Sequence, residues 1–237
     1  TAPEVLKFFM SIGVPLFEAY GMTENCAYAT SNSPENIKIG TVGIPAHGVE
    51  LKLADDGEIL IRSGGVFKGY FKDDQATSET IDKDGWLHTG DVGIYEGDFV
   101  KIIDRKRDII ITSGGKNVSP SEIENKIKVS PFIKEAIVIG DRRKFLSVLI
   151  GIEFDTVSNW ALRKNIPHTT YRDLSEKQEV KDLVWKEISK ANELTSSLEV
   201  REFRMIPKEL DHEEGELTAT QKVKRNVLID QFSDLIE

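Results

Sequence analysis

The pattern of apolar and polar residues over the first hundred positions predicts β-strands joined by short turns. Four runs have strand length, with apolar residues alternating or grouped as in strands that bury one face. These runs are Val49–Leu53, Glu58–Arg62, Asp91–Tyr95 and Phe99–Ile103. Glycine-bearing turns at 55–57 and 96–98 separate the members of each pair, which is typical of hairpins. We therefore expect an antiparallel β module, with a short strand at 15–20 and helices at 3–12 and 73–80.

The pattern changes after residue 104, where segments with helical and strand-like patterns alternate. The run Ser119-Pro120-Ser121-Glu122 combines an N-cap serine, a first-turn proline and a glutamate three residues after the cap. It therefore predicts a helix that extends to about Val129. Further strands are expected at 133–139, 146–154 and 202–206, and further helices at 156–164, 176–194 and 224–236. The chain as a whole is thus expected to be of mixed α/β and α+β class.

This change of composition predicts two domains, residues 1–104 and 105–237, that meet at Asp104–Arg105. The junction contains no Gly/Ser-rich linker. We therefore expect the two domains to adopt a small set of relative orientations.

The composition narrows the classes of function. The 237 residues carry a formal net charge of −9 and the pI is about 5.1, so nucleic acid is not an expected partner. No apolar run approaches the ~20 residues of a membrane-spanning helix, and peripheral contact with a membrane is left open. The single cysteine, Cys26, excludes an internal disulfide and fits a cytoplasmic location, and we expect it to be a small buried residue. The four histidines lack metal-ligand spacing.

Three glycine-bearing segments carry groups suited to a nucleotide, although each also has an ordinary structural interpretation. Tyr20-Gly21-Met22-Thr23-Glu24 places an aromatic ring, a hydroxyl and a carboxylate at a strand end, where they could contact a base, a phosphate and Mg²⁺. Gly90-Asp91 could offer a carboxylate to a ribose diol or simply form a turn. Ser113-Gly114-Gly115 could let the backbone approach a ligand or form a turn. The sequence contains neither a Walker A motif nor Gly-x-Gly-x-x-Gly.

Basic residues gather at 101–107 and at 222–225, and such runs usually lie on a solvated surface. Lys222, which follows an acidic segment, has the same ordinary interpretation. The block Gly85-Trp86-Leu87-His88-Thr89-Gly90-Asp91, just upstream of the basic run at 101–107, favours a functional interpretation of that run instead.

Taken together, these blocks resemble the adenylate-forming enzyme superfamily and, within it, the long-chain acyl-CoA synthetases. The matching blocks are Tyr20–Glu24, Gly85–Asp91, Asp104–Asp108, Ser113–Asn117 and Lys222–Arg225, and the similarity covers nearly the whole chain. Two positions depart from the pattern, because Ala219 stands where the family often has Pro and Asp104 where the wider superfamily often has Gly.

The resemblance implies a fold and a position within a longer protein. Residues 1–104 would form the last, β-rich part of the large adenylating domain, and residues 105–237 the smaller, mobile C-terminal domain. A phosphate loop and most of the acyl pocket would lie in a missing N-terminal portion, which agrees with the lack of an initiator Met. The fragment alone is therefore expected to be inactive.

The resemblance also implies a role for each matched residue. The residues expected to bind ATP are Tyr20 at the adenine, Gly21 next to it in the same block, Thr23 at the α-phosphate, and Asp91 and Arg105 at the ribose hydroxyls. Those expected to serve the chemistry are Lys222 in the adenylation step, Thr23, and Glu24 as the ligand of Mg²⁺. Those expected to serve the second step are Gly114 and Gly115, which would line the pantetheine channel of CoA, with Arg107 as the hinge between the domains. Lys116, in the same block, is expected to be a further cofactor-binding residue.

The implied activity has two half-reactions. A fatty-acid carboxylate attacks ATP to give acyl-AMP and pyrophosphate, and the thiol of CoA then takes the acyl group and releases AMP. Two other functions are weighed beside it: an adenylating domain that loads an acyl carrier protein, and a non-catalytic interaction module. The presence of both Lys222 and Glu24 weighs against the interaction module.

Overall fold

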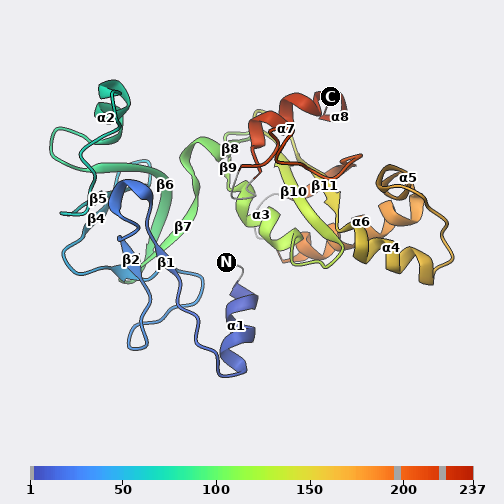
Figure 1. Cartoon of the computed structure of the whole chain (residues 1–237), viewed down its shortest axis with the longest axis horizontal. Helices are drawn as coiled ribbons and strands as arrows, with labels where there is room; N and C mark the ends of the chain where they lie inside the picture. The colour runs from blue at the N-terminus through green and yellow to red at the C-terminus, as the bar shows by residue number, and fades with distance from the viewer. Residues whose placement is uncertain (1–2, 195–198, 219–222, 237) are drawn as a thin grey trace. The chain divides into compact units, whose positions relative to one another are not determined.

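A computed structural model describes residues 3–194, 199–218 and 223–236 of the chain. The chain divides into two compact units, Thr1–Asp108 and Ile109–Glu237. Figure 1 colours the first unit from blue to green and the second from green to red. In the part of the chain that the structure describes, no helix has the length and apolar character needed to cross a membrane.

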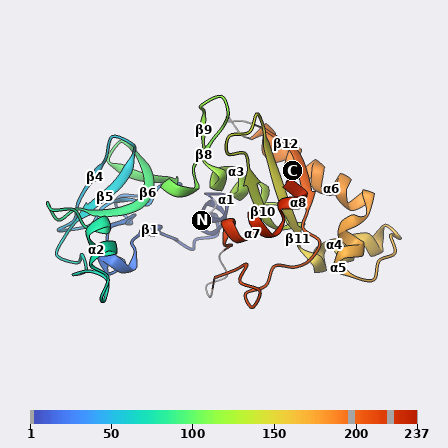
Figure 2. The ribbon, with the colours of Figure 1, turned by 90° about the horizontal axis from the view of Figure 1, so that it is seen from above.

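The first unit is built on an antiparallel four-stranded sheet with the strand order β4-β5-β6-β7. The strands are β4 (Glu50–Leu53), β5 (Glu58–Arg62), β6 (Leu87–Glu96) and β7 (Phe99–Arg105), as Figure 2 shows from above. Buried apolar side chains form its core, namely Ala29, Ile59, Ile61, Leu87 and Val100. The sheet confirms the expected antiparallel β module, and Arg105, placed at the domain boundary by the sequence, is the last residue of β7.

Strand β6 begins four residues earlier than the sequence pattern indicates, and this changes the status of Gly90 and Asp91. Both residues lie inside the strand, so the interpretation of Gly90-Asp91 as a turn is wrong. The pairing of β5 with β6 is irregular between Glu58 and Leu60, opposite this segment. Gly90 has a φ of 69°, a value that glycine adopts without strain, and it thereby accommodates the irregularity.

Shorter elements complete the first unit. They are α1 (Pro3–Ser11), η1 (Thr23–Asn25), α2 (Asp74–Thr80) and a small sheet of β1 (Ala19–Tyr20), β2 (Thr30–Ser31) and β3 (Ile44–Pro45). The side chain of Asp73 caps α2 by accepting the Ala76 N–H at 2.9 Å. The strand expected at 15–20 is confined to its last two residues. Cys26 is exposed and has a φ of 56°, so the expectation that it is buried is wrong.

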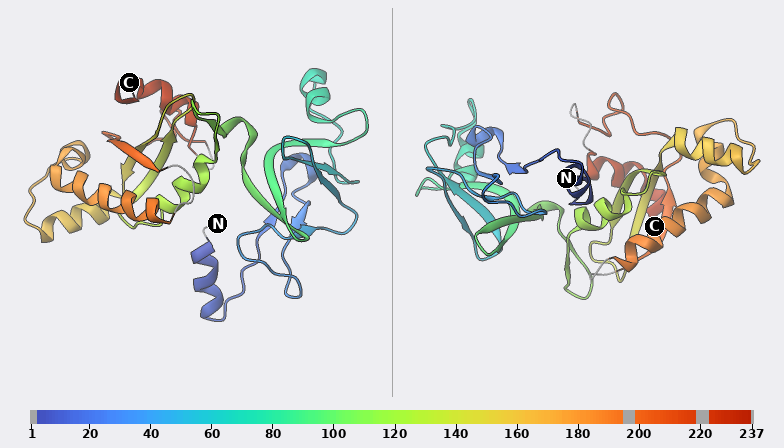
Figure 3. Two further views of the ribbon diagram at one scale, coloured as in Figure 1. Left: turned by 180° about the vertical axis from the view of Figure 1, so that it is seen from behind. Right: turned by 90° about the horizontal axis from the view of Figure 1, so that it is seen from below.

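The second unit is built on a mixed sheet in which β10 (Ile133–Ile139) pairs antiparallel with β11 (Leu146–Ile152), and β11 pairs parallel with β12 (Val200–Met205). Helices cover both faces of this sheet (Figures 1 and 3). Ala136 and Val138 face a core that includes residues of α3 (Pro120–Ile127), α4 (Phe154–Arg163) and α6 (Gln178–Glu193). Ile137 and Ile139 face residues of α7 (Arg225–Gln231) and α8 (Ser233–Ile236). Burial on both faces explains the nearly continuous apolar run of β10.

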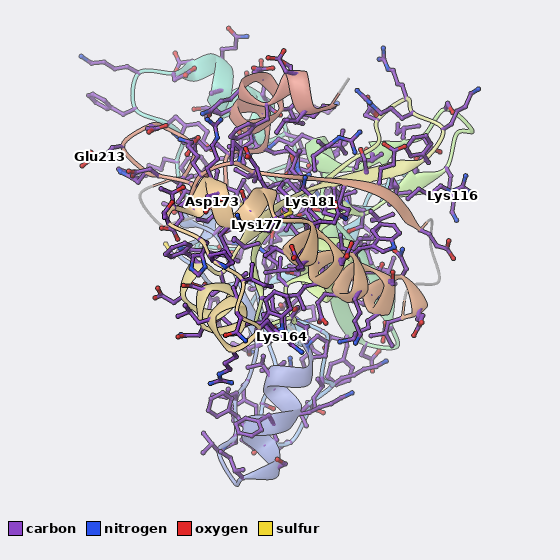
Figure 4. All side chains as sticks on the ribbon, turned by 90° about the vertical axis from the view of Figure 1, so that its right-hand side faces the viewer. Lys116, Lys164, Asp173, Lys177, Lys181 and Glu213 are labelled. Carbon is purple, nitrogen blue, oxygen red and sulfur yellow. The ribbon has the colours of Figure 1, made fainter. Side chains whose placement is uncertain are left out.

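Two of the expected helices are interrupted. The segment expected to be helical from residue 176 contains the end of α5 (Tyr171–Glu176) and all of α6, separated by Lys177 in an extended conformation. Thr170 caps α5, and Lys177 pairs with Asp173 at 2.9 Å beside that break (Figure 4). The last expected helix is likewise divided into α7 and α8 at Phe232, whose side chain is buried.

The remaining pair, β8 (Ile110–Ile111) and β9 (Asn117–Val118), forms a short hairpin.

Candidate functional site

Three of the residues singled out from the sequence meet in the first unit. Tyr20 Oη donates to Asp91 Oδ2 at 2.5 Å, and Arg105 Nε lies 2.9 Å from Asp91 Oδ1. Asp91 is only 5% exposed, whereas about half of the Arg105 side chain is exposed. The arrangement is a buried carboxylate held between a phenol and a guanidinium, with the guanidinium reaching toward solvent.

The strands explain why these side chains meet. Asp91 of β6 and Arg105 of β7 are opposite one another in the antiparallel register, so their side chains emerge side by side. Tyr20 ends β1, where the chain leaves the small sheet. Thr89 supports the arrangement, because its Oγ1 accepts the Asp91 N–H at 3.1 Å and donates to the Ile59 carbonyl at 2.8 Å.

The electrostatics keep Tyr20 in its neutral form. Burial and the hydrogen bond to the Asp91 carboxylate together raise the pKa of Tyr20 well above its ordinary value. The phenol therefore remains a donor at neutral pH, and Asp91 remains an acceptor with a cation beside it. Each carboxylate oxygen can accept more than one hydrogen bond, so Asp91 can also receive a pair of vicinal hydroxyls.

The segment after β1 places Thr23 and Glu24 in η1. A Cβ atom at Gly21 would lie 2.2 Å from the Ala27 carbonyl carbon, so only glycine allows the chain to fold back this closely. Thr23 is exposed, and Glu24 Oε1 accepts a hydrogen bond from Tyr70 Oη at 2.8 Å. This hydrogen bond is the main cause that raises the pKa of Tyr70.

The sequence did not identify Tyr70 as a site residue. Its contact with Glu24 spans 46 residues and has no local signature in the sequence. Thr89 was missed for the same reason, since its role depends on β5 lying beside β6.

The carboxylate of Glu24 is compatible with one ligand position on a magnesium ion. Tyr70 occupies Oε1, and no hydrogen bond of Oε2 is found among the described residues. These residues contain no group of three or more His, Cys, Asp or Glu side chains arranged around a metal. Mg²⁺ is commonly held by one or two carboxylates together with substrate phosphates and water, so a single glutamate fits that mode of binding.

The basic stretch after β7 forms η2 (Lys106–Asp108) and ends the first unit. Lys106 pairs with Asp56 at 2.5 Å and with Glu58 at 3.0 Å. The Arg107 side chain is 84% exposed, and its ion pair with Asp108, at 3.9 Å, is long. Lys106 is thus tied to the sheet, whereas Arg107 points into solvent.

Gly114, Gly115 and Lys116 lie in the second unit, at the turn between β8 and β9. Figure 4 shows Lys116 at this turn. Gly115 has a φ of 74°, so the turn itself requires a glycine there. Gly114 has no such φ, and a Cβ atom there would meet nothing within 4 Å. Neither the turn nor the packing of the described residues explains a glycine at position 114.

Lys222 lies outside the described residues, but the segments on either side of it are well anchored. Leu217 and Val223 form a bridge, and the Lys224 N–H donates to the Glu216 carbonyl at 2.8 Å. The buried Glu216 side chain accepts the Asp211 N–H through Oε2 at 2.8 Å.

Arg225 fixes the start of α7 to the rest of the second unit. Its Nη2 lies 2.7 Å from Glu124 Oε1, and its Nη1 donates to the Val138 carbonyl at 2.8 Å. Burial raises the pKa of Glu124 above its ordinary value, and the Arg225 guanidinium together with the Val138 N–H offsets only part of that rise. The ion pair joins α3, β10 and α7.

Two protein families match the chain. The family described as AMP-binding enzyme C-terminal domain matches residues 107–237, and the family described as AMP-binding enzyme matches residues 1–71.

Curated proteins with similar sequences include long-chain fatty-acid–CoA ligases. FadD15 of Mycobacterium bovis is 38% identical over 233 residues, which cover 97% of this chain and 39% of that ligase. Long-chain-fatty-acid–CoA ligase 6 of Mus musculus is 35% identical over 254 residues, which cover 100% of this chain and 36% of the mouse protein. The chain thus spans about two fifths of the length of these relatives.

A solved structure shares the fold. O-succinylbenzoate coenzyme A synthetase of Bacillus subtilis, in complex with AMP, is similar with a TM-score of 0.70 and 26% sequence identity. The similarity covers 96% of this chain and 44% of the Bacillus protein.

Proposed function

Because the chain belongs to the AMP-binding enzyme family, we propose that it is part of an ATP-dependent, AMP-forming ligase that activates a long-chain fatty acid and transfers it to CoA. The fatty-acid specificity rests on the similarity to long-chain fatty-acid–CoA ligases. This chain spans about two fifths of the length of those relatives, and the complete ligase would add the phosphate loop and most of the acyl pocket to it. Residues 1–237 alone would then form no acyl-CoA.

The observation that carries this proposal is the Asp91 carboxylate held between Tyr20 and Arg105. We assign Asp91 and Arg105 to the ribose hydroxyls, with Asp91 accepting from the diol. Tyr20 and Gly21 would border the adenine, and Thr23, exposed at the start of η1, would donate to the α-phosphate. A buried carboxylate that has a fixed orientation accepts a diol without reorganising, which favours tight and specific binding.

Glu24 would hold Mg²⁺ through the oxygen that Tyr70 does not use. The ion would supply positive charge to the phosphates of the bound nucleotide. Tyr70 orients the carboxylate, and its raised pKa keeps it a hydrogen-bond donor.

The reaction would proceed in two half-reactions. In the first, the fatty-acid carboxylate attacks the α-phosphorus, the bond to pyrophosphate breaks, and acyl-AMP forms. Lys222 would stabilise the negative charge that develops on the carboxylate and phosphate oxygens. In the second, the CoA thiolate attacks the acyl carbonyl and AMP leaves.

The second half-reaction would use the β8–β9 turn of the second unit. Gly114 and Gly115 would line the path of the pantetheine arm, and Lys116 would lie beside it. Since Lys222 and the glycine turn cannot both occupy one site, the C-terminal domain would rotate about Arg107 between the two steps, while Arg105 and Lys106 stay with the first unit. The exposure of the Arg107 side chain is compatible with such a pivot.

The experiment that tests this function is the substitution Asp91→Ala in the complete ligase. We expect a rise in the KM for ATP of roughly tenfold or more, because a charge-assisted hydrogen bond contributes about 1.5–3 kcal/mol. The KM for the fatty acid should stay nearly unchanged. Asp98→Ala, in the turn after β6, is the matched control. An unchanged KM for ATP in Asp91→Ala would remove the residue from the nucleotide site. Transfer to a carrier protein with none to CoA would contradict the second step.

A further inference from the structure

A second buried carboxylate lies next to the candidate nucleotide site and has no part in the proposed chemistry. Glu58, the first residue of β5, is 6% exposed. Its Oε1 accepts the Gly90 N–H at 3.0 Å, and its Oε2 lies 3.0 Å from Lys106 Nζ and 3.3 Å from His88 Nδ1. One side chain therefore joins the irregular part of β6 to the first residue of η2.

On the β6 side, Glu58 acts on the residue that precedes Asp91. The regular pairing of β5 with β6 is interrupted here, and the Glu58 carboxylate binds the Gly90 N–H at the interruption. Gly90 has a φ of 69° and no side chain of its own to hold it. The Glu58 carboxylate thus fixes the backbone that sets the direction of Asp91.

On the η2 side, Glu58 acts on the residue that precedes Arg107. Lys106 is held by both Glu58 and Asp56, and these two hydrogen bonds raise the pKa of Lys106, so it stays a cation. Burial acts to raise the pKa of Glu58, but the donors Lys106, Gly90 and His88 together hold that pKa below its ordinary value. The link is therefore an ion pair at neutral pH.

The pair joins a buried carboxylate to a half-exposed ammonium, and such ion pairs often contribute little net stability, so stability alone explains this one poorly. Its geometry offers a better explanation, because it connects the candidate ribose ligand and the candidate pivot through one carboxylate. We propose that Glu58 is a positioning residue that orients Asp91 through Gly90 and ties Lys106 to the first unit, so that rotation begins at Arg107. This inference rests on the proposed function.

The test uses three variants of the complete ligase. Glu58→Gln keeps the size of the side chain and removes its charge, Lys106→Met removes the cation, and the third variant combines the two. Glu50→Gln is the control, since Glu50 forms an exposed ion pair with Arg62 at 2.6 Å in the same sheet. Three quantities are measured: the KM for ATP, the rate of pyrophosphate release, and the rate of CoA transfer from supplied acyl-AMP.

Glu58→Gln should raise the KM for ATP by about tenfold and change the ratio of the two half-reaction rates. Lys106→Met should change the ratio of the two half-reaction rates by about the same factor as Glu58→Gln changes it. It should leave the KM for ATP within about twofold of the wild-type value, since the Gly90 N–H still donates to Glu58. The double variant should change the ratio no more than the larger single change, because both substitutions break one link.

Equal behaviour of Glu58→Gln and the Glu50→Gln control would overturn the inference, as would additive changes of the ratio in the double variant. If Glu58→Gln fails to fold, Lys106→Met decides the question, because that side chain is about half exposed. A wild-type ligase that forms no acyl-AMP would overturn the proposed function itself, whereas a normal wild type with an unchanged ratio in Lys106→Met would overturn only the inference.

Discussion

At the scale of single residues, Asp91 shows how one carboxylate acquires its surroundings from three parts of the chain. The phenol comes from β1, the guanidinium from β7 and the supporting hydroxyl from its own strand. The sequence could point to Tyr20, Asp91 and Arg105 as separate candidates, through the blocks that contain them. Their contacts depend on the pairing of β6 with β7 and on a side-chain hydrogen bond between residues 71 positions apart, which composition and local pattern do not encode.

The hydrogen bond between Tyr20 and Asp91 predicts a measurable contribution to stability. Tyr20→Phe should lower the free energy of unfolding of residues 1–237 by about 1–3 kcal/mol, because a buried carboxylate oxygen loses its donor. Tyr28→Phe is the control, since that hydroxyl is exposed and makes only a 3.4 Å contact with the His47 carbonyl. Urea unfolding measures both. Equal losses in the two variants would show that the short hydrogen bond contributes nothing specific.

The hydrogen bond between Tyr20 and Asp91 also predicts how the stability of the fold changes with pH. The pKa of Tyr20 is raised in the folded state, so above about pH 10 the unfolded chain loses this proton while the folded chain keeps it. The stabilising contribution of Tyr20 is therefore fully present below about pH 10 and is lost as the pH rises further. We expect the stability difference between wild type and Tyr20→Phe to shrink on that alkaline side. A difference that grows with pH would contradict the assignment of the neutral phenol.

At the scale of elements, the pattern of apolar residues predicted which helices and strands exist better than it predicted the residues at which they begin and end. The hairpins of the first unit are confirmed, and so are the central strands of the second unit, whose apolar runs follow from burial on both faces. The start of β6 was missed because Gly90 has low strand propensity, and pairing of Leu87 and His88 with β5 overrides it. The break at Lys177 was missed because the local sequence suits a helix on both sides, while the Thr170 cap begins α5 earlier.

The ion pair between α3 and α7 predicts a large effect of Arg225 on stability. Arg225→Met should lower the free energy of unfolding by about 3–5 kcal/mol, because Glu124 is left buried without its cation. Arg172→Met should change it by only about 0–1 kcal/mol, since its pair with Glu176, at 3.6 Å, is exposed. Thermal or urea unfolding distinguishes them. A loss below about 1 kcal/mol in Arg225→Met would contradict the role of the pair in anchoring α7.

A substitution at Gly114, in the short turn between β8 and β9, should affect function without affecting stability. Gly114→Ala should leave the free energy of unfolding within about 0.5 kcal/mol of wild type, because an added Cβ meets nothing nearby. If the turn lines the path of CoA, the same substitution should slow thioester formation by roughly tenfold or more and leave pyrophosphate release unchanged. Gly64→Ala, also in open space, is the control. Unimpaired thioester formation would exclude Gly114 from that path.

At the scale of the whole molecule, the chain contains two compact units with different proposed tasks. The first unit carries Tyr20, Asp91 and Glu24, and the second carries the β8–β9 turn and the segments that flank Lys222. The family was recognisable from the sequence because its blocks keep their order and spacing, and the matches at residues 1–71 and 107–237 confirm it. The link from Glu58 to Gly90 and Lys106 was not recognisable, since it depends on the start of β5, the interior of β6 and the residue after β7 lying close together.

The central claim, that one chain serves two successive half-reactions, is tested most directly at Lys222. In the complete ligase, Lys222→Ala should slow acyl-AMP formation by about 10²–10³, the usual effect of removing one preorganised donor. Transfer to CoA from supplied acyl-AMP should survive, because that step would use the other orientation of the C-terminal domain. Lys224→Ala, two residues away and exposed at the start of α7, should affect acyl-AMP formation far less. Equal loss of both half-reactions in Lys222→Ala, or control of the first by Lys224, would contradict the account.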